Sequence, residues 1–109
     1  MKTFAKIITI LYLTILFMGQ KVLADEKIKI GLLVPLSGAN SKIGKSIIKS
    51  IRLAINTIDN SSIEIIPKDT ASNPETTLIN AKKLYADGVR IVIGPVFNKN
   101  LIYLDELQD

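Results

Sequence analysis

Cysteine and histidine are both absent from this chain of 109 residues. Without cysteine it can form no disulfide, no thiolate nucleophile and no zinc–thiolate site, and it has no thiol to carry a lipid. Without histidine it lacks the commonest general base and metal ligand. Catalysis by carboxylates alone would need a pair of acids, and Asp69 and Glu75 fall on different predicted elements. The composition predicts a protein that is not an enzyme and that uses no metal or cofactor.

Positive charge is not concentrated in the body of the chain. The net charge of +4 includes three lysines among the first 24 residues, where there is no acid. The rest carries 11 basic and 10 acidic side chains, a net charge of +1. Aromatic residues make up only 6% of the chain, and no long run of Lys or Arg is present. Nucleic-acid binding is therefore not expected.

The N-terminus has the three-part layout of a secretory signal peptide. A short basic segment, "MKTFAK", precedes twelve uncharged residues from Ile7 to Met18, and "VLA" then fits a small-residue cleavage site. The uncharged run is shorter than the roughly 20 residues that span a bilayer. We predict cleavage after Ala24; the alternative is an uncleaved signal anchor, because Lys21 lies close to that site. Either way, residues 25–109 are expected outside the cytosol, in the periplasm.

The stretch "IGLLVPLSGANSKIGKSII", residues 30–48, invites comparison with a phosphate-binding P-loop. A P-loop has four residues between its two glycines, and five separate Gly38 from Gly44. Because consecutive backbone N–H groups must wrap one phosphate chain, an extra residue is a serious misfit. The stretch is therefore predicted to be a strand, a loop and the start of a helix.

Apolar spacing predicts strands alternating with helices. A continuous apolar run favours a strand covered on both faces, and steps of three and four residues favour an amphipathic helix. The helix after Asn73 should begin at Pro74, bury Leu78, Ala81, Leu84 and Tyr85, and end at Gly88. The predicted elements are a strand at 28–34, a helix at 42–59 capped by Ser41, a strand at 63–66, a helix from 74, a strand at 89–94 and a helix from 101.

This order, β-α-β-α-β-α, predicts an α/β fold of three layers with a parallel sheet and right-handed crossovers. Ligands of such sheets bind beyond the carboxyl ends of the strands. The loops at 35–41, 67–73 and 94–98 should meet there, each leading into a helix N-terminus that favours an anion such as a carboxylate. The alternative is that Ser37, Ser41, Asn73 and Asn98 merely cap turns, and Asp69 is expected to organise its loop.

Three segments, "IKIGLLVPLSG", "IEIIPKDTASNPETT" and "LYADGVRIVIGPVF", resemble the first lobe of type 1 periplasmic binding proteins. The similarity covers nearly all of residues 27–104 and is greatest to the leucine/isoleucine/valine-binding branch. It implies two α/β lobes that are joined by a hinge and close on a small ligand. A complete member is several-fold longer, so we expect residues 25–109 to be the N-terminal part of such a domain.

The resemblance suggests which residues would contact a ligand, and it also shows departures from the family. A serine that helps hold the ligand carboxylate corresponds to Asn98, and an aromatic of the first loop corresponds to Ile43. A cysteine pair that ties two loops corresponds to Ser72 and Phe97. The candidate ligand contacts are Ser37, Gly38, Asn40 and Asn98.

Two functions follow from the resemblance. The first is capture of a small ligand, an amino acid or related compound, for an ABC-type permease. The second arises because "LLVPLSG", "PKDT" and "IGPVF" also resemble a sub-branch that activates penicillin-binding proteins, where the partner is a peptidoglycan synthase. Members of that sub-branch are lipoproteins, and this chain has no cysteine to lipidate. The sequence does not decide between these functions, and it does not identify the ligand or the oligomeric state.

Overall fold

A computed structural model of the chain describes residues 1–18, 26–58 and 61–107. The elements in chain order are α1 (Lys2–Met18), β1 (Ile28–Val34), α2 (Ser41–Thr57), β2 (Ile63–Asp69), α3 (Pro74–Ala86), β3 (Ile91–Ile93) and the 3-10 helices η1 (Asn98–Leu101) and η2 (Leu104–Leu107).

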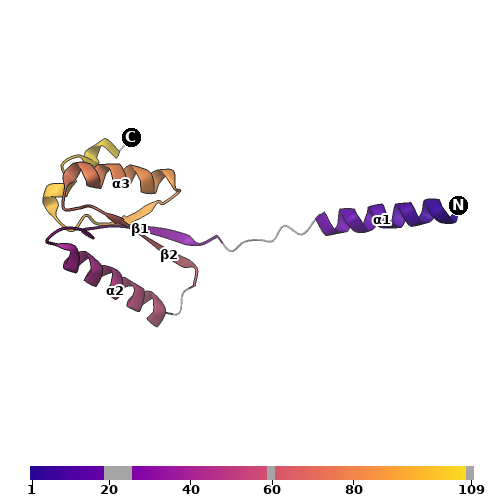
Figure 1. Cartoon of the computed structure of the whole chain (residues 1–109), viewed down its shortest axis with the longest axis horizontal. Helices are drawn as coiled ribbons and strands as arrows, with labels where there is room; N and C mark the ends of the chain where they lie inside the picture. Colours follow the sequence, from indigo (N-terminus) through magenta and orange to yellow (C-terminus); the bar gives the residue numbers. More distant parts are fainter. Residues whose placement is uncertain (19–25, 59–60, 108–109) are drawn as a thin grey trace.

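The three strands form one parallel sheet in the order β2-β1-β3. Ile28 of β1 lies opposite Ile63 of β2, and Ile30 lies opposite Ile91 of β3. Helices α2 and α3 cover opposite faces of this sheet (Figure 1). The predicted α/β fold with three layers and parallel strands is therefore confirmed.

The first helix, α1, contains the uncharged run of the predicted signal peptide. Among the residues that the structure describes, no helix is both long enough and apolar enough to cross a bilayer. The predicted cleavage site after Ala24 lies outside the described residues.

Strand β1 is central and supplies much of the core. Leu32, Leu33 and Val34 have at most 1% of their surface exposed. Leu33 packs with Ala81, Leu84 and Val89 on the side of α3. Since neighbouring side chains of a strand point to opposite faces, Leu32 and Val34 face α2. The continuous apolar run was predicted to be covered on both faces, and it is.

Strand β2 extends three residues beyond its predicted end, to Asp69. The sequence "PK" was interpreted as the start of a loop, but Pro67 lies in register with Leu32. A proline within a strand is tolerated where its missing N–H is not needed for pairing. Among the described strands β2 is an outer one, so one side of its backbone needs no partner.

Helix α2 begins one residue earlier than predicted. Ser41 is its first residue, so Asn40 takes the N-cap position, and the Asn40 side chain makes no capping hydrogen bond. The assignment of Ser41 as N-cap is therefore wrong. The helix ends at Thr57, and the predicted end at 59 lies outside the described residues.

Helix α3 confirms the predictions made for both of its ends. Asn73 Oδ1 accepts a hydrogen bond from the backbone N–H of Thr76 at 2.9 Å, and Pro74 is the first helical residue. Gly88 has a φ of +83°, the left-handed conformation expected after a helix end.

The predicted buried face of α3 is confirmed at Ala81 and Leu84 but not at Tyr85. Thr77 is fully buried, together with Ala81 and Leu84, whereas Tyr85 is 66% exposed. Instead of entering the core, the Tyr85 ring lies against the guanidinium group of Arg90. The distance from the guanidinium carbon to the ring centroid is 4.5 Å. The side chains that α3 buries, Thr77, Ala81 and Leu84, are therefore four and three residues apart on one face of the helix. Tyr85 lies beside this face.

The C-terminal segment is less regular than predicted. Strand β3 has only three residues, and the helix expected from residue 101 is replaced by η1 and η2. Leu101 and Ile102 remain 48% and 66% exposed. A longer helix would be stabilised mainly by burying an apolar face. Among the described residues, Leu101 and Ile102 have little surface against which to pack.

Candidate functional site

The carboxyl ends of β1 and β2 are joined by the Asp69 side chain. Asp69 Oδ1 accepts hydrogen bonds from the backbone N–H groups of Leu36 at 2.7 Å and Ser37 at 3.3 Å, both in the loop after β1. It also accepts one from the N–H of Ala71 at 2.8 Å, in its own loop. Asp69 thus organises its own loop, as expected from the sequence, and also the loop after β1, which was not predicted.

These contacts shift the acidity of Asp69. Burial by itself would raise the pKa of this carboxyl, but hydrogen bonds oppose it, from the Ser37 side chain and from the backbone of Leu36, Ala71 and Ser37. Together they hold the pKa below its ordinary value of 3.8. Asp69 is therefore an anion at neutral pH whose charge is already shared among protein donors.

A second link joins the same two loops. Asn40 Nδ2 donates a hydrogen bond to Ser72 Oγ at 3.1 Å. Ala71 and Ser72 both have positive φ angles, 48° and 54°, a conformation that non-glycine residues rarely adopt. The Ser72 N–H donates to Thr70 Oγ1 at 3.3 Å, and Thr70 is fully buried. Ser72 occupies one position of the family's cysteine pair, but here it is bonded to the first loop.

The structure brings three of the four predicted ligand contacts together on the first loop. Ser37 and Gly38 are exposed and Asn40 is half-buried. Asn98 lies on a different segment, where it begins η1 and is exposed. No hydrogen bond joins Asn98 to the first loop within the described parts of the chain. The proposed ligand-binding role of these residues stays a prediction.

Gly44 of the "GKS" sequence has a packing role. It is buried in the first turns of α2, and a Cβ atom added there would collide with the carbonyl oxygen of Pro35. Because Pro35 directly follows β1 and is itself buried, a side chain would push the helix away from the sheet. The glycine that resembles part of a P-loop thus allows close contact between helix and strand.

Asn100 is the polar residue that the sequence analysis missed. It is fully buried in η1, and neither side-chain polar atom has a hydrogen-bond partner within the described residues. Such burial costs about 1–3 kcal/mol. The sequence "NKNL" gave no signal of it, because burial here depends on the packing of η1 against α3.

Metal-binding side chains are not grouped in this fold. Within residues 1–18, 26–58 and 61–107, no three acidic, histidine or cysteine residues lie close enough to hold a metal ion. At the carboxyl ends of the strands, the loops and the helix N-termini can offer hydrogen bonds to a ligand.

Comparison with protein families decides the classification. Residues 27–101 match the model of a family described as periplasmic binding protein. The chain belongs to the periplasmic binding protein family. The resemblance that the strand-end motifs suggested is thereby confirmed. The loops described above lie at the carboxyl ends of the strands, where ligands of such sheets are expected to bind.

Two solved structures similar to this periplasmic binding protein come from Haemophilus influenzae. The first is the C-domain of LpoA (YraM), a regulator of PBP1A, with 27% identity over 73% of this chain and a TM-score of 0.60. The second is full-length LpoA, with 30% identity over 73% of this chain and a TM-score of 0.56. The matched regions cover 25% and 14% of those two chains. A search of curated proteins found no match.

Proposed function

We propose that this chain is part of an extracytoplasmic module that binds and regulates a penicillin-binding protein. The support comes from the two LpoA structures, which share 27% and 30% identity with this chain, because LpoA is a regulator of PBP1A. The partner would be a peptidoglycan synthase, and the chain's own surface would contact it.

The likeness to these two structures is the observation that carries this proposal, and the geometry of the loops adds to it. Asp69 receives three backbone hydrogen bonds, and Asn40 is bonded to Ser72. A ligand that took Asp69 Oδ1 or Asn40 Nδ2 as its partner would displace these bonds, at a cost of about 0.5–1.5 kcal/mol for each. Loops that are fixed in this way at the carboxyl ends of the strands favour a surface that recognises another protein over loops that close around a solute.

The proposal is tested by capture of the synthase. The tagged protein is immobilised and exposed to solubilised membrane proteins whose penicillin-binding proteins carry a fluorescent penicillin. We expect at least one labelled protein to be retained, and none on resin that carries an unrelated periplasmic domain. Absence of any labelled protein would contradict the proposal.

Delivery of a small solute to an ABC permease is the second candidate. It is favoured by the family itself and by the exposure of Asn98, whose amide could hydrogen-bond a ligand carboxylate. Ligand at 100 times its dissociation constant would stabilise the protein by about 2.7 kcal/mol. A raised melting temperature with one amino acid, combined with failure to capture a synthase, would favour this candidate over the first.

We also propose that residues 1–24 are a signal peptide and that residues 25–109 belong to a leucine-binding-protein-like domain. The family match from residue 27 onward supports an extracytoplasmic location. Protein isolated from cells should begin at Asp25 when its N-terminus is sequenced. An intact Met1 would instead indicate a retained signal anchor.

A further inference from the structure

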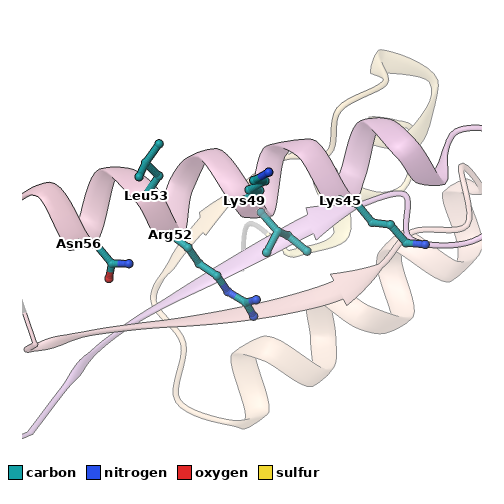
Figure 2. Close-up of a pocket in the computed structure, with 6 residues that line it drawn as sticks. Lys45, Lys49, Arg52, Leu53 and Asn56 are labelled. Carbon is teal, nitrogen blue, oxygen red and sulfur yellow. The ribbon is translucent and has the colours of Figure 1, made fainter.

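The strongest concentration of charge lies on α2. This helix has four basic side chains and no acidic one. Three of them, Lys45, Lys49 and Arg52, line an open groove of about 550 Å³ beside the helix. The groove is completed by Ile48, Leu53 and Asn56. We name the three cations together the basic flank; Figure 2 shows them following one another along α2, with Lys45 and Arg52 extended toward the strands.

The basic flank is not explained by the stability of the helix. Like charges three and four residues apart repel one another, and Lys45 is four residues before Lys49. Lys42 and Lys45 also lie near the N-terminus of α2, the positive end of its dipole. No ion pair to the basic flank is found within the residues whose placement is described. The arrangement therefore lowers the stability of an isolated helix.

Charge is also segregated around the exposed surface of α2. Next to these cations around the helix lie Ser46, Ser50 and Thr57, which are small, uncharged and exposed. The groove side has the three cations and an exposed Leu53, at 66%. Residues 27–58 as a whole contain six basic residues and no acid. A cationic surface with apolar side chains among the charges suits an acidic protein segment that also has apolar groups.

We infer that the basic flank of α2 docks an acidic segment of the partner protein. This inference rests on the proposed function, and the segment would belong to the penicillin-binding protein. Its carboxylates would pair with Lys45, Lys49 and Arg52, and an apolar side chain would cover Leu53. Attraction over this surface steers the partner into place, so its main effect is on the association rate.

The test compares two triple variants of the purified protein. Lys45→Glu/Lys49→Glu/Arg52→Glu reverses the basic flank. Lys27→Glu/Lys83→Glu/Lys99→Glu reverses three exposed lysines outside α2 and changes the net charge by the same amount. Association and dissociation rates are measured against the captured synthase in 50 mM and 500 mM salt, and circular dichroism checks folding. A Lys45→Gln/Lys49→Gln/Arg52→Gln variant provides a milder change.

We expect reversal of the basic flank to slow association about tenfold in 50 mM salt, with a smaller difference in 500 mM salt, where charges are screened. The glutamine variant should lie between, and the control triple should bind like the unaltered protein. Equal rates for the two reversals would overturn the inference while leaving the proposed function intact. Failure of the unaltered protein to bind any synthase would overturn both. Binding of the same variants to phosphatidylglycerol vesicles is measured in parallel. If reversal of the basic flank weakens binding to these vesicles but not to the synthase, the flank binds a membrane and the inference of docking to protein is contradicted.

Discussion

Replacing Gly44 with alanine is expected to lower the free energy of unfolding by about 2–3 kcal/mol. In an exposed helix the same change would stabilise by up to about 1 kcal/mol, because alanine is the better helix former. Here the added Cβ meets the carbonyl oxygen of Pro35, which is backbone and has no side-chain freedom to move away. The sign of the effect therefore reports directly on the contact between α2 and the end of β1. Chemical denaturation of both proteins measures it.

Ser46→Ala is the matched control for this change. Ser46 lies two residues further along α2 and is exposed. Its replacement should alter the free energy of unfolding by no more than about 0.5 kcal/mol. A Gly44→Ala protein at least as stable as the parent would show that the first turns of α2 do not pack against Pro35.

Replacing Asp69 with alanine is expected to destabilise the fold by about 2 kcal/mol. Three backbone N–H groups lose their acceptor, and that of Leu36 is partly buried and poorly placed to bind water instead. Asp69→Asn keeps an oxygen in the same place but removes its charge, so about half of that loss is expected. Thermal unfolding of the two variants at neutral pH gives both numbers.

The effect of Asp69 should also depend on pH. Since the folded-state pKa of this carboxyl lies below 3.8, the charged form is bound better in the fold than in the unfolded chain. Its contribution is therefore complete above the unfolded pKa and is lost as the pH falls from 3.8 through the folded value. In Asp69→Asn this part of the acid destabilisation should be absent. An unchanged pH profile would mean that Asp69 does not carry the loops as an anion.

The parts of the fold that local chemistry determines were predictable. The apolar run of β1 requires cover on both faces, and Asn73 and Gly88 each satisfy a backbone requirement at a helix end. The expectation that Asp69 organises its own loop is confirmed by the hydrogen bond that it accepts from the N–H of Ala71, two residues further along the chain. Asn73 and Gly88 gave correct predictions because their roles depend on neighbours close in sequence, whereas Asp69 also binds the distant loop after β1.

The remaining features depend on contacts between distant segments. Whether Thr77 or Tyr85 enters the core is decided by how α3 is rotated on the sheet. The role of Gly44 depends on an approach to Pro35, and the pairing of Asn40 with Ser72 depends on two loops that meet only after folding. Side-chain spacing along the chain carries no information on such distances. Ser37, Gly38 and Asn40 are neighbours because they share one loop, Asn98 lies on another segment, and the ligand-binding role of all four stays a prediction.

The central strand of the sheet is the first of the three to be synthesised. Leu32 in β1 has Pro67 on one side and Ile93 on the other, and both come later in the chain. If the chain is exported from its N-terminus, as proposed above, β1 arrives before either neighbouring strand. During that interval Leu32, Leu33 and Val34 have nothing to pair with and are open to aggregation. The rate of such export relative to the rate of strand pairing would then set the fraction of the protein that folds.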